Sequence, residues 1–460
     1  MWHPDLSLPG QPKYLALAGA IATGIVSKQL SVGERLPPVR DLAWQLHVTP
    51  GTVARAYAKL VKDGLLEAVV GRGTFVAKPM VQPDWAPADE VNTSEPEMIE
   101  LVSPMLPDVG QDALIRRCYA KLSQMPNQNL LRYPSQTSEV AAKRAIYRWL
   151  NGVNLGPFEA EDIVLAHGGQ DAIMLILQSI LKGAEPVILT EELSYAGFRR
   201  GAQLLRARVV GVECDQHGVR PDKFELACKE HGAQVLCTSP EVHNPTTVHT
   251  GQARRQEIAE VARRYYCHIL EDDCYQLQES GLPRYRELLP ELGWYVSSLS
   301  KSLTPSLRVG FALAPRAMTH DLKRAARYNH FGLAVPICDV TEMLLNSAVL
   351  PDMRQELRAQ VNSYIHVAVN VLGGFDLKWR KDVPFLWLKL PQGWRTTAFC
   401  RAAEQNGVRV RPADDFALLD GRAPHAVRIT INGRLSLPVF EKAVSVLLKL
   451  LDNPDDDIEI

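Results

Sequence analysis

Residues 298–310 read Ser-Leu-Ser-Lys-Ser-Leu-Thr-Pro-Ser-Leu-Arg-Val-Gly, with apolar stretches typical of strands on both sides. Lys301 stands among hydroxyl residues, and Arg308 follows seven positions later. A lysine amine in this setting can form a Schiff base with an aldehyde cofactor, while hydroxyls and a guanidinium hold a nearby phosphate. The alternative is a surface lysine at a strand-to-loop turn, so the interpretation needs support from the rest of the chain.

A glycine pair lies upstream, between a predicted strand and a predicted helix. Residues 162–165 are expected to form a buried strand, Gly168 and Gly169 follow, and helical periodicity runs over 172–181. Backbone N–H groups at such a helix start bind anions, aided by the helix dipole. The pattern is common in α/β proteins, so it is weak evidence alone.

Two more predicted strands end in polar residues. Asn244 follows the strand at 234–237, and the sequence Glu-Asp-Asp-Cys-Tyr at 271–275 ends the strand at 268–270. An aspartate at a strand end can pair with a protonated ring nitrogen and keep the ring an electron sink. Such an aspartate can equally be a helix cap or a loop residue.

Taken in order, these residues resemble the fold-type I pyridoxal-phosphate enzymes, and specifically the class I/II aminotransferases, over roughly residues 100–450. The resemblance implies a large α/β lobe with a mainly parallel sheet at about 150–345. It also implies a smaller α+β lobe at about 346–452, ending in a helix over 438–451. An acidic tail, 452–460, follows.

The resemblance also implies roles for single residues around pyridoxal 5'-phosphate. Lys301 is the catalytic lysine that forms the Schiff base, and Asp273 pairs with the pyridine nitrogen. Asn244 and Tyr275 donate to the phenolic oxygen of the ring, and Tyr195 stacks on its face. The residues implied to hold the phosphate are Gly169, Gln170, Ser298, Ser300 and Arg308, with Tyr133 reaching the phosphate of the neighbouring subunit.

Arg428, in Val-Arg-Ile-Thr at 427–430, matches the strand arginine that binds a substrate α-carboxylate through two parallel hydrogen bonds. The alternative is that it pairs with a structural acid in the small lobe. Departures from the family pattern predict altered loops: Thr247 replaces the glycine of Asn-Pro-Thr-Gly, and Ser138 stands where a glycine is expected. His167 replaces a serine and is expected to be a packed loop residue rather than a catalytic base.

The first 79 residues follow a different pattern. Helical periodicity over 14–25, 39–46 and 50–62, and two β-type stretches at 65–70 and 74–77, predict a winged helix-turn-helix. Residues 1–78 contain nine Lys or Arg and five Asp or Glu, a surplus of +4, whereas the whole chain carries −1 and the remainder therefore −5. A basic surplus there favours DNA binding over a three-helix domain without nucleic acid.

This part resembles the GntR family of bacterial repressors over about residues 12–78. By that resemblance Arg40 and the start of the 50–62 helix face the major groove, and the wing tip enters the minor groove. The family often has an arginine at the position of Pro50, so base readout there is expected to differ. The implied DNA contacts are Arg40, Thr49, Thr52, Arg55, Gly71, Arg72 and Gly73.

Residues 80–97 are rich in proline and acids and are predicted to be a linker, followed by the aminotransferase-like part at 98–460. A GntR-type head fused to this part resembles the MocR/GabR/PdxR-type regulators. That implies a homodimer on promoter DNA, with cofactor sites at the subunit interface and DNA-binding heads swapped across the dimer. Three readings remain open: a sensor of pyridoxal phosphate or of an amino-acid or amine effector, a working aminotransferase with a DNA-binding head, and a dimerisation platform without cofactor.

The composition of the sequence argues against several other classes of protein. Hydrophobic residues make up 46% and charged residues 22%, which is ordinary for a globular protein, and no apolar stretch is long enough to span a membrane. Eight cysteines without a Cys-x-x-Cys pair indicate reduced thiols in the cytoplasm, with no metal site and no disulfide framework.

Overall fold

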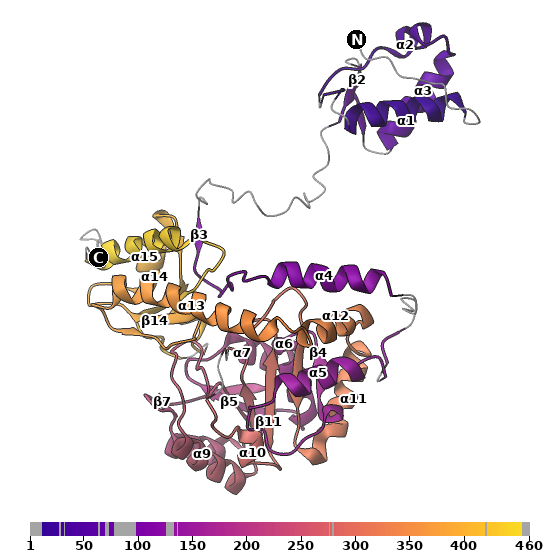
Figure 1. Cartoon of the computed structure of the whole chain (residues 1–460). Helices are drawn as coiled ribbons and strands as arrows, with labels where there is room; N and C mark the ends of the chain where they lie inside the picture. The colour runs from indigo at the N-terminus through magenta and orange to yellow at the C-terminus, as the bar shows by residue number, and fades with distance from the viewer. Residues whose placement is uncertain are drawn as a thin grey trace. The chain divides into compact units, whose positions relative to one another are not determined.

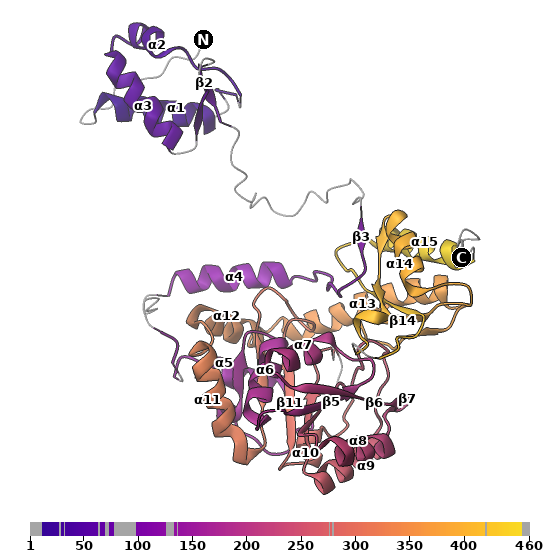
Figure 2. The same ribbon diagram turned by 180° about the vertical axis from the view of Figure 1, so that it is seen from behind.

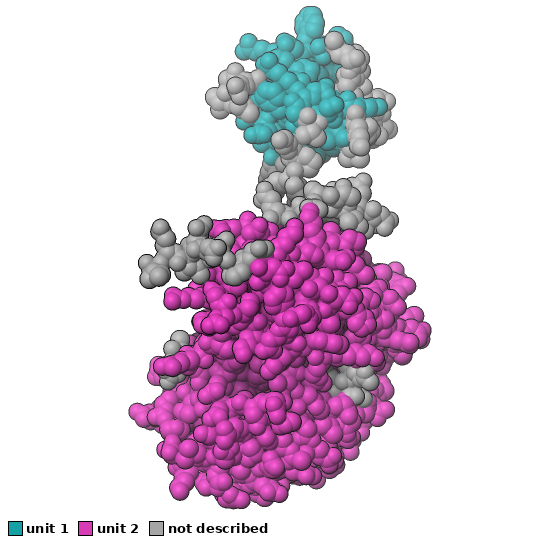
Figure 3. Space-filling model, turned by 90° about the vertical axis from the view of Figure 1, so that its left-hand side faces the viewer, with its two compact units in different colours: residues 1–94 teal, residues 95–460 magenta. Residues whose placement is uncertain are grey.

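The computed structural model describes residues 12–26, 29–31, 33–62, 65–69, 73–77, 98–125, 133–135, 137–275, 277, 280–418 and 421–452. The chain divides into two compact units, residues 1–94 and 95–460, which Figure 3 colours separately. The boundary falls inside the predicted linker, which lies outside the described residues, as does the acidic tail beyond 452.

The first unit is a winged helix-turn-helix, as the sequence predicted. Its core contains Leu17, Val53 and Leu60, which lie on the inward faces of two helices. Thr49 precedes the third helix, and its Oγ1 accepts a hydrogen bond from the backbone N–H of Thr52 at 3.3 Å. The described elements are α1 (Lys13–Val26), α2 (Val39–Gln45), α3 (Pro50–Lys62), β1 (Leu66–Val69) and β2 (Gly73–Val76), with the two strands antiparallel.

The second unit contains a large lobe built on a seven-stranded sheet of order β4-β12-β11-β10-β9-β5-β6 (Figure 1). All pairings are parallel except those of β12, which is antiparallel to both neighbours. The strands are β4 (Val164–Ala166), β5 (Val187–Glu191), β6 (Arg208–Val212), β9 (Val235–Thr238), β10 (His268–Asp272), β11 (Gly293–Ser298) and β12 (Gly310–Leu313). The mainly parallel sheet predicted for this lobe is confirmed.

Helices cover both faces of this sheet, and Figure 2 shows it from behind. On one face α6 (Gly169–Ile180), α7 (Ala196–Leu204) and α11 (Thr319–His330) bury Leu270 and Val296 of the sheet. The opposite face buries Ile269 and Tyr295. The helices there are α4 (Gln111–Ser123), α5 (Val140–Trp149), α8 (Pro221–His231), α9 (Gln252–Tyr265), α10 (Tyr285–Leu288) and α12 (Val335–Leu345). Because side chains alternate along a strand, a residue at the end of a strand points to the same face of the sheet as the residue two positions before it.

The small lobe packs an antiparallel sheet of order β13-β14-β17-β16 against helices. Its elements are β13 (Leu377–Lys378), β14 (Phe385–Lys389), α14 (Thr396–Gln405), β15 (Val408–Arg409), β16 (Arg411–Pro412), β17 (Ala426–Thr430) and α15 (Leu437–Asp452). The helix α13 (Leu350–Leu372) contributes Leu350 to the core of the large lobe and Val361 to that of the small lobe. The strand β3 (Ile99–Glu100) pairs with β15, in parallel. Among the described residues, no helix is both long and apolar enough to cross a membrane.

Candidate functional site

The predicted cofactor residues come mostly from the carboxyl ends of the parallel strands, where α/β sheets place their ligand sites. Lys301 follows β11 and is half-buried, and its Nζ donates a hydrogen bond to the Pro104 carbonyl oxygen at 3.2 Å. Burial, with Arg428 and Arg308 nearby, lowers the pKa of Lys301 to about 8. A larger fraction of this amine is therefore uncharged near neutral pH than in an ordinary lysine, which favours attack on an aldehyde.

The start of α6 forms a cup into which Arg308 reaches. Gly168 precedes the helix with φ +89°, and a Cβ there would lie 2.6 Å from Arg308 Nη2, so only glycine fits. Arg308 itself has φ +52° and donates from Nη2 to the His167 carbonyl at 3.4 Å. The hydroxyl of Ser300 is buried and has no hydrogen-bond partner among the described residues.

Two further residues that are predicted to hold the phosphate lie next to this cup. A Cβ at Gly169 would lie 3.8 Å from the Ser298 Cβ, and Ser298 Oγ accepts from the Ser300 N–H at 3.0 Å. The side chain of Gln170 donates to the Gly197 carbonyl at 3.2 Å, so its backbone N–H at the helix start is the group that remains for an anion. His167 is exposed, and its ring contacts that of His330 edge-on.

The prediction that Asp273 faces the cofactor ring is contradicted by its position. Asp273 Oδ2 accepts hydrogen bonds from Tyr295 at 3.0 Å and Arg284 Nε at 3.1 Å, and Tyr295 packs on the sheet face opposite α6. Arg284 also pairs with Glu241 at 2.9 Å. Burial raises the pKa of Asp273 to about 7, and Oδ1 is buried without a partner among the described residues. Asp273 thus belongs to a buried ion-pair network.

The preceding residue, Asp272, lies on the site face instead. It is the last residue of β10 and shares the face of Leu270, which packs in the α6 core. Burial raises the pKa of Tyr195 and Tyr275, and the charge of Asp272 raises both further. Burial raises the pKa of Asp272 to about 6, and its Oδ1 accepts from the Cys274 N–H at 3.1 Å. The alternation of the strand was the signal in the sequence that could have identified it.

Arg428 lies in β17 and is 1% exposed. Its Nη1 donates to Asn244 Oδ1 at 2.5 Å, and its Nη2 donates to the Val102 carbonyl at 2.8 Å. The rings of Phe385 and Phe416 lie 5.3 Å and 4.8 Å from the guanidinium carbon. No carboxylate among the described residues forms an ion pair with Arg428, and the carboxylate binding expected of it stays a prediction.

Unpartnered polar atoms complete this corner of the site. Arg428 Nε and Asn244 Nδ2 are buried and make no hydrogen bond among the described residues. Burial lowers the pKa of Arg428 to about 10, and Tyr275 counteracts this fall. Nearby, Thr247 adopts φ +64°, in the left-handed region that favours glycine. The expectation of an altered loop at this position stays a prediction.

Two predicted contacts concern other molecules. Tyr133 is 85% exposed and its ring lies 6.2 Å from that of Phe331, and its contact with a neighbouring subunit stays a prediction. In the first unit Arg40, Thr49 and Arg55 are exposed and Thr52 is half-buried. Gly73 has φ +120°, whereas Gly71 and Arg72 lie outside the described residues.

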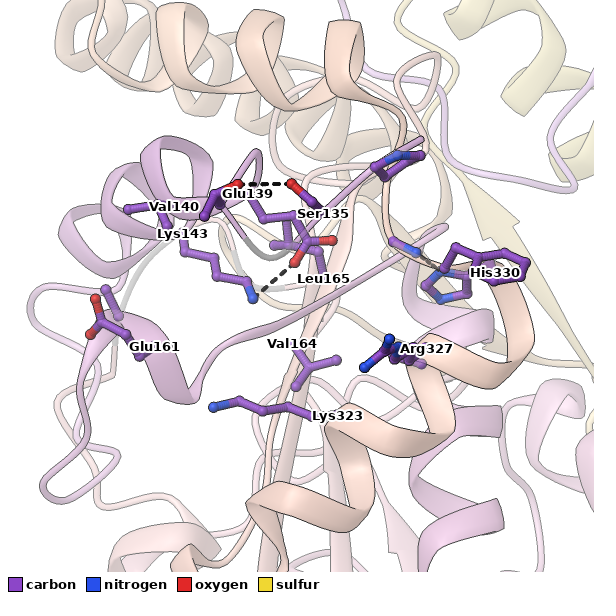
Figure 4. Close-up of a pocket in the computed structure, with 16 residues that line it drawn as sticks. Ser135, Glu139, Val140, Lys143, Glu161, Val164, Leu165, Lys323, Arg327 and His330 are labelled. Atoms are coloured by element: carbon purple, nitrogen blue, oxygen red, sulfur yellow. Dashed lines mark hydrogen bonds and ion pairs between the residues drawn. The ribbon is translucent and has the colours of Figure 1, made fainter. Parts of the chain in front are cut away.

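A separate cavity of about 610 Å³ lies between α5, β4 and α11 (Figure 4). Lys143 pairs there with Glu139 at 2.8 Å, and Lys323 and Arg327 come from successive turns of α11. None of the predicted cofactor residues lines this cavity, so it is distinct from the Lys301 site.

Comparison with known proteins agrees with the division of the chain into two units. Residues 101–447 match the family model "Aminotransferase class I and II", and residues 13–76 match "Bacterial regulatory proteins, gntR family". The HTH-type transcriptional regulator YdeF of Bacillus subtilis is 26% identical over 98% of this chain and 97% of its own length. The vitamin B6 salvage pathway transcriptional repressor PtsJ of Salmonella typhimurium is 26% identical over 90% of this chain and 93% of its own.

A solved structure shows the same fold in the second unit. The α-aminoadipate aminotransferase LysN of Thermus thermophilus, complexed with N-(5'-phosphopyridoxyl)-L-leucine, superposes with a TM-score of 0.67 at 20% identity, covering 78% of this chain and 93% of LysN. The confirmed resemblance thus extends over both units. This chain belongs to the aminotransferase class I and II family and carries a GntR-type winged helix ahead of that domain.

Proposed function

We propose that this protein is a transcriptional regulator that binds pyridoxal 5'-phosphate and DNA, and that it senses either the cofactor or an amino-acid or amine effector. The observation that carries the proposal is a set of buried, unpartnered polar atoms around a reactive lysine, in a chain that also has a DNA-binding head. The relatives YdeF and PtsJ, named as a transcriptional regulator and a transcriptional repressor, support the regulatory reading. A DNA-binding head of this family supports a location in the cytoplasm.

The residues present fit pyridoxal phosphate. Ser300 Oγ, Arg308 and the first N–H groups of α6 would hold the phosphate, and Lys301 would bind the aldehyde covalently. Asp272 would pair with the ring nitrogen, in place of Asp273. Asn244 Nδ2, a buried donor without a partner, suits the phenolic oxygen. When bound, the cofactor supplies an electron sink conjugated to an amine.

The effector would bind through its carboxylate to Arg428. A buried guanidinium without an acidic partner gains most from a ligand carboxylate, because the charge-assisted pair offsets the desolvation of both groups. Tyr275, together with Phe385 and Phe416, would surround the carboxylate with apolar and aromatic surface. An amino acid therefore suits the site better than a simple amine.

A second copy of the chain would complete the assembly. Tyr133, Tyr328 and Phe331 are exposed by 85%, 77% and 69%, and such large aromatic side chains favour an interface. We infer a homodimer in which Tyr133 contacts the phosphate of the partner's cofactor.

Borohydride reduction of the purified protein, followed by peptide mapping, tests the cofactor assignment. The label is expected on Lys301. A label only on another lysine, or protein that takes up no cofactor, would refute the proposal.

A panel of amino acids separates the regulator from an aminotransferase. A sensor shifts the visible spectrum of the cofactor and changes DNA affinity without sustained formation of a keto acid. Sustained turnover with a keto acid as second substrate would favour the enzyme.

A further inference from the structure

The segment at residues 99–105, which we call the strap, crosses the candidate site just after the predicted linker. Two of its carbonyl groups accept hydrogen bonds from basic side chains of the site. Val102 O accepts from Arg428 Nη2 at 2.8 Å, and Pro104 O accepts from Lys301 Nζ at 3.2 Å. The sequence gives no sign of this role, because backbone carbonyls leave no signature in side chains.

The rest of the strap is bound to the small lobe. The Leu101 N–H donates to the Arg409 carbonyl at 2.8 Å, and the Met105 N–H donates to the Ile431 carbonyl at 3.0 Å. The Leu101 side chain is fully buried in the core of the small lobe. The strap is thus an ordered element, and its first residues directly follow the chain that leads to the winged helix.

We propose that the strap is an internal competitor for the effector site, and that a bound amino acid releases it and so passes the binding signal to the linker. This inference rests on the proposed function. It assigns to Val102 and Pro104 a regulatory role, in which their carbonyls satisfy Arg428 and Lys301 until a ligand replaces them.

The hydrogen bonds of Arg428 show which contact a carboxylate displaces. Nε and Nη2 form one edge of the guanidinium, and on that edge Nε has no partner among the described residues while Nη2 donates to the Val102 carbonyl. Asn244 binds Nη1, outside this edge. A carboxylate that binds Nε and Nη2 side by side therefore displaces Val102 and leaves Asn244 in place.

Bond strength favours the ligand. A carboxylate adds its own negative charge to the bond with the guanidinium, and the ligand forms two parallel hydrogen bonds where the strap forms one. Covalent engagement of the Lys301 amine leaves it at most one N–H, which weakens its bond to Pro104 as well. A cofactor-bound amino acid has displaced Lys301 from the aldehyde, so the contact that its carboxylate removes is the one between Arg428 and Val102.

Hydrogen exchange of the full-length protein tests this with two stable probes. N-(5'-phosphopyridoxyl)-L-leucine carries the phosphate, the ring and a carboxylate, whereas pyridoxamine 5'-phosphate lacks the carboxylate. Amides of residues 99–103 and 105 should exchange roughly fivefold faster with the leucine conjugate than with pyridoxamine phosphate, the factor expected for loss of one ordinary hydrogen bond. Residues 252–265 of α9 serve as the unaffected control.

The outcomes separate the two proposals. If neither probe binds, the proposed function fails. If both bind and the exchange of residues 99–105 is the same, the strap mechanism alone is overturned.

A disulfide tests the link to DNA. Ile99 and Val408 are direct partners in the β3–β15 pair, so Ile99→Cys with Val408→Cys would fix the strap to the small lobe. The oxidised variant should bind both probes but lose the effect of the leucine conjugate on DNA affinity, and dithiothreitol should restore that effect; each single variant should respond like the natural protein. An oxidised variant that responds fully would overturn the mechanism.

Discussion

Replacing Asp272 by asparagine should weaken cofactor binding and, at the same time, stabilise the cofactor-free protein. The ionised carboxylate would pair with the ring nitrogen, and a charge-assisted hydrogen bond of this kind contributes about 1.5–3 kcal/mol. Asp272→Asn should therefore raise the Kd for pyridoxamine phosphate by about 10- to 150-fold. Titration followed by absorbance measures this change.

The stability effect follows from the raised pKa. Burial raises the pKa of Asp272 from 3.8 in the unfolded chain to about 6, so the folded state holds the proton more tightly. The free energy of unfolding therefore falls as the pH rises from about 4 to about 6, by up to about 3 kcal/mol for the shift of roughly two units. Asparagine does not ionise, so Asp272→Asn removes this fall in the free energy of unfolding. Its side-chain oxygen can keep the hydrogen bond from the Cys274 N–H. Urea unfolding at pH 4 and pH 7 should show a smaller fall for the variant.

Asp273→Asn is the matched control. Asp273 belongs to a buried cluster in which Glu241, Glu271 and Asp273 face Arg255 and Arg284, so removal of one negative charge leaves both arginines paired. Its cofactor affinity should stay within about twofold of the natural protein, since it makes no contact with the ring. Loss of cofactor in Asp273→Asn, with normal binding in Asp272→Asn, would refute the assignment and restore Asp273.

Three further outcomes follow from the geometry. Arg428→Lys keeps the positive charge but loses the planar guanidinium that can form two parallel hydrogen bonds. Binding of N-(5'-phosphopyridoxyl)-L-leucine should therefore weaken by at least about tenfold, while pyridoxamine phosphate binds normally. Equal weakening of both would contradict the assignment. Gly168→Ala places a Cβ 2.6 Å from Arg308 Nη2 at φ +89°, so urea unfolding should show a loss of about 1–3 kcal/mol, against little change for Gly374→Ala, where a Cβ meets nothing within 4 Å. Arg40→Ala should lower the slope of log affinity for promoter DNA against log salt by about 0.9, and an unchanged slope would exclude a phosphate contact.

Local patterns were enough to predict much of the fold and the centre of the site. The Lys301 stretch, the glycine pair before α6 and the helical periodicity of the first unit depend on neighbours in sequence, and each predicted element is present. The helix α6 begins at Gly169, three residues before its periodicity becomes visible, because Gly169, Gln170 and Asp171 add no apolar side chain to the pattern.

Contacts between distant segments could not be predicted in the same way. Asp272 and Asp273 are neighbours with identical side chains, and only the face of β10 on which each one lies separates them. Arg284 comes 11 residues after Asp273, and nothing local indicates that they pair. The Val102 and Pro104 contacts involve backbone oxygens, for which residue identity carries no information.

Thr247 affects how relatives of this chain would be recognised in genomes. A search that requires glycine after Asn-Pro-Thr would discard it, although the loop follows the backbone path of a glycine. A β-branched residue adopts that path at a cost of about 1–2 kcal/mol, so the surroundings must impose it. The Thr247 N–H donates to the His243 carbonyl at 2.8 Å and Arg380 donates to the Thr247 carbonyl at 3.4 Å, which fixes the turn from both sides. A search pattern based on backbone angles would find such chains, whereas a pattern based on residue identities would miss them.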